Sequence, residues 1–147
     1  QHDSYPIIEN YKKGVKVDLT TLVNQKKKIL IVEDDKDFLW LLRQNFNNQP
    51  FAVLYAQDGQ EGLAAAQKEN PDLILADVLM PKMDGITMIQ KLKELGNKSQ
   101  VIFLTNMKDI DHISSAMEAT GESDYIVKSD IRLDVVLERV RKKLGIE

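Results

Sequence analysis

Short apolar runs alternate with segments of helical periodicity from Lys28 onward, and this alternation repeats five times. The runs are almost continuously apolar instead of alternating between apolar and polar residues. Such runs predict strands that are covered on both faces, as in a parallel sheet between two layers of helices. The predicted strands are Ile29–Val32, Phe51–Ala56, Leu73–Ala76, Val101–Leu104 and Tyr125–Val127.

The segments between and after these runs have the spacing of amphipathic helices. In the last of them, apolar residues recur every three or four positions from Leu133 to Leu144, which gives a single apolar stripe. Five successive units of strand and helix favour a doubly wound α/β domain. The predicted helices are Lys36–Asn47, Gly59–Glu69, Gly85–Leu95, Asp109–Thr120 and Asp130–Leu144.

The first part of the chain follows neither pattern. Its apolar residues are scattered and form no helical stripe. We interpret residues 1–26 as an N-terminal arm or linker and residues 27–147 as the compact domain.

Composition and charge narrow the classes of function. The chain has 147 residues, of which 43% are hydrophobic, enough for one core. Its net charge of −3 argues against a surface built to bind nucleic acid. The absence of cysteine excludes disulfides and thiolate metal sites and fits a reducing compartment such as the cytoplasm. No apolar run approaches the roughly 20 residues of a membrane span, so we expect no membrane insertion.

Polar residues of the kinds that bind metals or take part in catalysis follow four of the five predicted strands. In an open parallel sheet, the carboxyl ends of the strands meet at one edge, where ligands bind. Carboxylates brought together there repel one another unless a proton or a cation neutralises them. Oxygen ligands, with no cysteine and no suitably placed histidine, favour Mg²⁺ or Mn²⁺ over Zn²⁺. The residues are Glu33, Asp34 and Asp35 after the first strand, Asp77 after the third, Thr105 after the fourth and Lys128 after the fifth.

Each of these residues also has an ordinary structural interpretation. The acidic cluster that starts at Glu33 can cap the following helix, because acids are favoured at a helix N-terminus. Asp77 can be a loop carboxylate, Thr105 a strand-end hydroxyl and Lys128 a solvated surface charge. Their joint occurrence at one sheet edge is harder to explain in this way.

Four segments resemble the receiver domain of two-component response regulators, the family that includes the CheY-like proteins. They are KILIVEDD from Lys28, PDLILADVLMPKMDG from Pro71, VIFLT from Val101 and DYIVK from Asp124. The similarity covers about residues 27–146 in order and spacing. It implies a flavodoxin-like (βα)5 fold with strand order 2-1-3-4-5.

The resemblance assigns a role to each residue at the predicted edge. It implies that Asp77 accepts a phosphoryl group from a phosphohistidine of a sensor histidine kinase or a histidine phosphotransfer protein. It makes Asp34 a direct ligand of Mg²⁺, with Glu33 acting mainly through water, and Asp77 and the main-chain carbonyl of Leu79 as further ligands. Lys128 would pair with the phosphoryl group.

The same resemblance implies a switch. Thr105 would move toward the phosphoryl oxygen and Tyr125 would swing into the space that it leaves. The face formed by the fourth helix, fifth strand and fifth helix would then change its preference for a downstream protein, and the resemblance also allows a homodimer through this face. The chain would be a phosphoacceptor that assists its own phosphorylation and slow dephosphorylation, and not an enzyme in its own right. The sequence leaves open whether it acts alone or within a larger protein.

Three other functions share some of these features. A pseudo-receiver would use the fold only as a phosphorylation-independent interaction module, but the full set of polar residues counts against it. An aspartyl-phosphate hydrolase of the haloacid dehalogenase class normally needs an acid at the position of Leu79. A flavin- or nucleotide-binding domain needs a phosphate loop where the acidic cluster lies, and acids repel phosphate.

Several positions depart from the usual receiver pattern. Ser129 follows Lys128 in place of the usual proline, and a cis bond before a residue other than proline costs about 2.5–4 kcal/mol. Leu79 and Met107 flank the expected path of the hydrolytic water and cannot orient it, so we predict slow self-dephosphorylation. Asn106 replaces a small residue. Helical geometry places Trp40 opposite the apolar face of its helix, available to a kinase or to the N-terminal arm.

Overall fold

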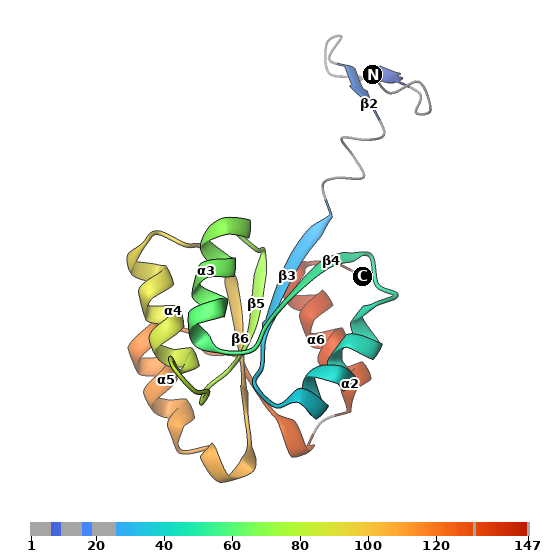
Figure 1. Ribbon diagram of the computed structural model, residues 1–147. Helices are drawn as coiled ribbons and strands as arrows, with labels where there is room; N and C mark the ends of the chain where they lie inside the picture. Colours follow the sequence, from blue (N-terminus) through green and yellow to red (C-terminus); the bar gives the residue numbers. More distant parts are fainter. Residues whose placement is uncertain (1–6, 10–15, 19–25, 131, 147) are drawn as a thin grey trace.

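The computed structural model describes residues 7–9, 16–18, 26–130 and 132–146. Five strands form one parallel sheet in the order β4-β3-β5-β6-β7, and these are the first to fifth strands predicted above, in the order 2-1-3-4-5 (Figure 1). The flavodoxin-like (βα)5 architecture is therefore confirmed. The strands are β3 (Lys27–Val32), β4 (Phe51–Ala56), β5 (Leu73–Asp77), β6 (Gln100–Thr105) and β7 (Tyr125–Val127).

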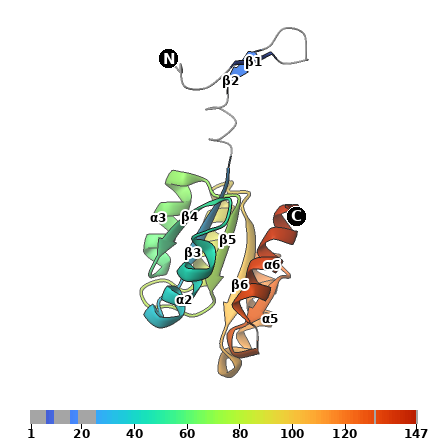
Figure 2. The same cartoon turned by 90° about the vertical axis from the view of Figure 1, so that its right-hand side faces the viewer.

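Helices cover both faces of this sheet. Helices α3, α4 and α5 pack on one face and α2 and α6 on the other, so that in Figure 1 the sheet lies between two layers of helices, and in Figure 2 the α2 and α6 layer faces the viewer. The alternation of strand side chains divides the core accordingly, because Leu30 and Val32 point into one layer and Ile29 and Ile31 into the other. The helices are α2 (Lys36–Phe46), α3 (Gly59–Glu69), α4 (Gly85–Glu94), α5 (His112–Thr120) and α6 (Leu133–Leu144).

Two predicted helices begin later than expected. The segment predicted to start at Asp109 opens with a short 3-10 helix, η1 (Met107–Asp109), and α5 begins only at His112. The segment predicted to start at Asp130 opens with another, η2 (Lys128–Asp130), and α6 begins at Leu133. The buried stripe of α6, with Val136 and Val140, lies entirely within the observed helix.

The N-terminal part contains two short strands that the sequence analysis did not predict. Strands β1 (Ile7–Glu9) and β2 (Lys16–Asp18) pair with each other in antiparallel orientation. Most of the predicted arm, residues 1–26, lies outside the described residues, and its boundary stays a prediction. In the part of the chain that the structure describes, no helix has the length and hydropathy needed to cross a membrane.

Candidate functional site

Four of the polar residues predicted to meet, Glu33, Asp34, Asp77 and Lys128, lie together at the carboxyl edge of the sheet. Asp77 ends β5, where it pairs in register with Leu104, and Glu33 follows β3 directly, with its N–H donating to the carbonyl of Ala56 at 3.0 Å. Both acids are almost completely buried, with Glu33 0% and Asp77 4% exposed. Two carboxylates at this depth need compensating charge, since burial without a partner is costly.

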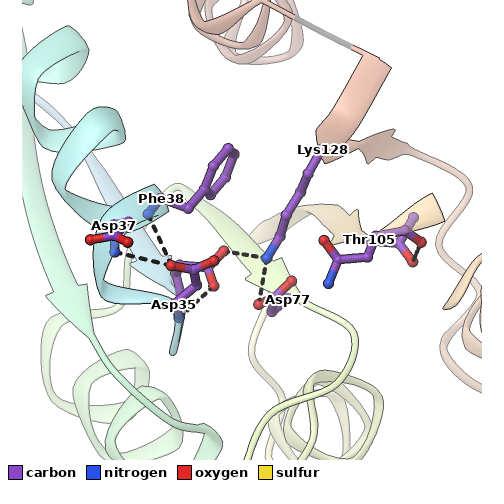
Figure 3. Close-up of polar contacts among 8 residues, drawn as sticks. Asp35, Asp37, Phe38, Asp77, Thr105 and Lys128 are labelled. Atoms are coloured by element: carbon purple, nitrogen blue, oxygen red, sulfur yellow. Dashed lines mark hydrogen bonds and ion pairs between the residues drawn. The ribbon is translucent and has the colours of Figure 1, made fainter. Parts of the chain in front are cut away.

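Lys128 supplies that charge. Its Nζ lies 2.8 Å from Oε1 of Glu33 and 2.9 Å from Oδ2 of Asp77, and only 8% of its side chain is exposed. Figure 3 shows the Lys128 side chain reaching toward Asp77, with a dashed line between the ammonium nitrogen and the Asp77 carboxylate. The described residues contain no cis peptide bond, so the peptide between Lys128 and Ser129 is trans. The lysine therefore points into the site without the usual proline.

The acidic cluster after β3 divides into separate roles. Asp35 is the N-cap of α2, and its Oδ1 accepts hydrogen bonds from the N–H groups of Asp37 and Phe38 at 3.0 and 3.2 Å. The capping interpretation is thus correct for Asp35. Glu33 instead points inward, and its Oε2 accepts the N–H of Asp35 at 2.8 Å.

Three carboxylates are close enough to share a cation. One oxygen each from Glu33, Asp34 and Asp77 lies within 4.8 Å of the others. In an octahedral Mg²⁺ site, with bonds of about 2.1 Å, opposite ligands are about 4.2 Å apart, so small side-chain movements would bring these oxygens to one ion. Asp34 is exposed, which leaves the cluster open on one side. These hard oxygen donors fit Mg²⁺ or Mn²⁺.

The charges in the site perturb one another. Burial raises the pKa of Asp77 to about 9, with the hydrogen bond and the negative charge of Glu33 acting in the same direction and Lys128 opposing them. Burial lowers the pKa of Lys128, but the two carboxylates outweigh burial and raise the pKa above its ordinary 10.5. Without a metal, the site therefore holds a proton on Asp77 and a charge on Lys128 at neutral pH.

The loop after Asp77 is fixed by close backbone packing. The N–H of Gly85 donates to the carbonyl of Val78 at 2.9 Å, and a Cβ atom at Gly85 would lie 1.9 Å from the carbonyl oxygen of Asp77. Only glycine fits there. Asp84 caps α4, because its Oδ1 accepts the N–H of Thr87 at 2.7 Å. This loop carries Leu79, whose carbonyl remains a predicted metal ligand.

The same loop packs closely against the start of α3. A Cβ atom at Gly59 would lie 2.0 Å from the carbonyl oxygen of Met83. Lys82, which has a left-handed φ of 69°, places its Nζ 3.6 Å from Oδ2 of the α3 N-cap Asp58. The sequence analysis only started helices at Gly59 and Gly85. A glycine directly after a helix-capping Asp was the available signal for close packing.

The predicted switch residues lie on the neighbouring strands. Thr105, at the end of β6, is 1% exposed, and its hydroxyl donates to the carbonyl of Asn106 at 3.2 Å (Figure 3). Tyr125, at the start of β7, is 36% exposed, and its carbonyl accepts Nη2 of Arg139 in α6 at 3.2 Å. Their roles in switching stay predictions.

Sequence reasoning overlooked one residue beside Lys128. Phe38 lies in the first turn of α2, and its ring centroid is 5.0 Å from the ammonium nitrogen of Lys128. Helical periodicity over Lys36–Asn47 places Phe38 on the apolar face of this helix and gives it no further role. A periodic pattern cannot show that a ring at the end of that face reaches a lysine ninety residues later in the chain.

Comparisons with known proteins agree with this geometry. The family model "Response regulator receiver domain" matches residues 29–141. The chain is 36% identical over 102 residues to the alkaline phosphatase synthesis transcriptional regulatory protein PhoP of Bacillus subtilis. The aligned part covers 69% of this chain and 42% of that protein. It is 31% identical over 121 residues to the sporulation initiation phosphotransferase F of the same organism, with 82% of this chain and 96% of that protein covered.

A solved structure has the same fold. The CheY-like response regulator receiver domain protein from Methanospirillum hungatei JF-1 superposes with a TM-score of 0.73 at 29% identity, over 82% of this chain and 95% of that one. The chain spans about half the length of the transcriptional regulators that it matches, 42% to 51%. The chain therefore belongs to the receiver domains of two-component response regulators.

Proposed function

We propose that the chain is a phosphorylation-activated receiver in which Asp77 accepts a phosphoryl group from the phosphohistidine of a sensor histidine kinase or a histidine phosphotransfer protein. The observation that carries this proposal is the buried Asp77 held 2.9 Å from Lys128 and grouped with two further carboxylates. An isolated structural aspartate needs no such group. The relative called a phosphotransferase aligns over 96% of its own length.

Each of these residues would have a separate role in phosphoryl transfer. An oxygen of Asp77 forms the new bond to phosphorus as the bond between phosphorus and the histidine nitrogen breaks. Mg²⁺, held by Asp34, Asp77 and the carbonyl of Leu79, with Glu33 acting mainly through water, would neutralise charge on the phosphoryl oxygens. The ammonium of Lys128, already 2.9 Å from Asp77, would stabilise the same charge, since transfer depends mainly on positioning and electrostatics.

Charge added at Asp77 would also start the switch. The Lys128 ammonium, now bound to Glu33 and Asp77, would form an ion pair with the phosphoryl group. The Thr105 hydroxyl would give up its hydrogen bond to the Asn106 carbonyl and donate to a phosphoryl oxygen instead. Tyr125, now at the surface, would swing inward and alter the face formed by α5, β7 and α6. We expect a downstream protein to read this face, whether from one copy or a dimer, and we place the protein in the cytoplasm.

The phosphorylated form should be long-lived. Leu79 and Met107 are 38% and 50% exposed and apolar, so neither side chain can orient a water molecule for attack on the phosphoryl group. Self-dephosphorylation is then slow, and the chain acts as a phosphoacceptor and not as a turnover enzyme. A half-life of seconds in Mg²⁺, without any phosphatase, would contradict this expectation.

Intact-mass spectrometry tests the proposal. The purified chain is incubated with acetyl phosphate or phosphoramidate, with and without Mg²⁺. We expect the mass to rise by one phosphoryl group in Mg²⁺, and little in a chelator or in Asp77→Asn. A chain that never gains a phosphoryl group would instead be a pseudo-receiver, an interaction module independent of phosphorylation.

A further inference from the structure

The direction of Lys128 depends on its surroundings, because the usual proline is absent after it. Ser129 follows in a trans peptide, and the backbone turns at once into η2. Lysine has a flexible four-carbon stem, and its loss of rotamer freedom on ordering is among the largest of any side chain. The contacts around the ammonium must compensate for that loss.

Those contacts come from two sides. The carboxylates of Glu33 and Asp77 approach Nζ to 2.8 and 2.9 Å. The ring of Phe38 lies beside the ammonium at 5.0 Å from centroid to nitrogen, and Figure 3 shows the ring next to the Lys128 side chain with Asp77 beyond the ammonium. A cation within about 6 Å of an aromatic face is attracted by the ring, most strongly where water is excluded.

The ring itself is held in place. The N–H of Phe38 donates to the capping Oδ1 of Asp35 at 3.2 Å, and the N–H of Asp35 donates to Oε2 of Glu33 at 2.8 Å. The side chain of Phe38 also packs against the core cluster beneath α2 and α6. The ring and the first carboxylate that binds Lys128 are therefore parts of one hydrogen-bonded turn.

We propose that Phe38 is a positioning residue that holds the Lys128 ammonium against Asp77 through the face of its ring. The ring covers the open side of the ammonium and limits it to orientations that point at the phosphoacceptor. An aliphatic side chain at this position would cover the same apolar surface without attracting the cation. The consequence for phosphorylation rests on the proposed function, whereas the contact itself does not.

Three variants separate these effects. Phe38→Leu keeps the apolar contact and removes the ring face, and Phe38→Tyr keeps the ring. Phe46→Leu is the matched control, because it removes a buried ring from the same helix, one that packs near Phe51 at 6.4 Å between centroids. Each is compared with wild type for folding, for the NMR shifts of the Lys128 Hε protons and for the rate of phosphorylation by acetyl phosphate in Mg²⁺.

The ring should be visible in the NMR spectrum without any phosphorylation. We expect Lys128 Hε protons shifted by the ring current in wild type and in Phe38→Tyr, and at their ordinary position in Phe38→Leu. We expect phosphorylation to slow by about threefold to tenfold in Phe38→Leu only. Phe46→Leu should be destabilised yet phosphorylated at nearly the wild-type rate.

Other results would overturn the inference. Ordinary Hε shifts in wild type would show that the ring does not lie over the lysine in solution. An unchanged rate in the folded Phe38→Leu protein, or an equal slowing in Phe46→Leu, would show that the ring does not position the lysine for transfer. If wild type takes up no phosphoryl group, the proposed function fails, and the Hε shifts alone decide whether Phe38 holds Lys128.

Discussion

Replacing Asp77 with asparagine should stabilise the metal-free protein. In the unfolded chain, Asp77 ionises around its ordinary pKa of 3.8, whereas in the folded protein its pKa is raised to about 9 by burial, the neighbouring Glu33 acting in the same direction. Folding between these pH values therefore takes up a proton. The free energy of unfolding falls as the pH rises through this interval, and Asp77→Asn has no such loss.

The stability gained by Asp77→Asn depends on how far the pH lies above the ordinary pKa of Asp77. Each pH unit is worth about 1.4 kcal/mol, so protonation of Asp77 on folding at pH 7 costs at most about 4 kcal/mol, counted from the ordinary value of 3.8. Asparagine resembles the protonated acid in size, but it gives up the attraction to Lys128. We expect Asp77→Asn to be more stable by about 1 to 4 kcal/mol at pH 7. At about 4 °C per kcal/mol, Tm would rise by roughly 4 to 15 °C.

Urea denaturation in EDTA, followed by circular dichroism at pH 5, 6, 7 and 8, measures this difference. The gap between Asp77→Asn and wild type should widen as the pH rises. Mg²⁺ should narrow it, because the ion binds folded wild type and offsets the carboxylate repulsion. A variant no more stable than wild type at every pH, or a gap that stays constant, would refute the assignment of a buried, proton-binding Asp77.

Three further changes test the site, the loop beside it and a candidate docking residue. Lys128→Met leaves the buried carboxylate of Glu33 without its cation, so it should cost about 3–5 kcal/mol in EDTA by urea denaturation, with part of the loss restored by Mg²⁺. Gly85→Ala drives a Cβ atom against the Asp77 carbonyl and should cost about 1–3 kcal/mol more than Gly96→Ala, which has a φ of 85° but open space around it. Trp40→Ala, which removes a side chain that is 59% exposed, should slow transfer from a histidine kinase and spare phosphorylation by acetyl phosphate; equal slowing of both would exclude docking through this residue.

The sheet and the polar residues at its carboxyl edge could be predicted from local patterns. Continuous apolar runs such as Ile29–Val32 occur where both faces of a strand are covered, and here both are, in two separate core clusters. A parallel sheet then brings the residues after its strands to one edge, which is why Glu33, Asp77 and Lys128 meet in the structure as predicted.

Contacts between distant segments could not be predicted in this way. The late starts of α5 and α6 reflect short 3-10 turns that have no apolar period to mark them. The sequence likewise placed Phe38 on the core face of its helix, but only the three-dimensional arrangement brings its ring to 5.0 Å from the Lys128 ammonium. The close approach of Gly85 to Asp77 depends on how the loop folds back.

The identity of the phosphorylated residue tests the central claim most directly. Wild type and Asp77→Asn are treated with acetyl phosphate and Mg²⁺, digested, and the modified residue is located by tandem mass spectrometry under conditions that preserve acyl phosphates. The proposed mechanism predicts one phosphoryl group on Asp77 in wild type and none at any site in Asp77→Asn. Modification of a different residue, or equal modification of both proteins, would contradict it.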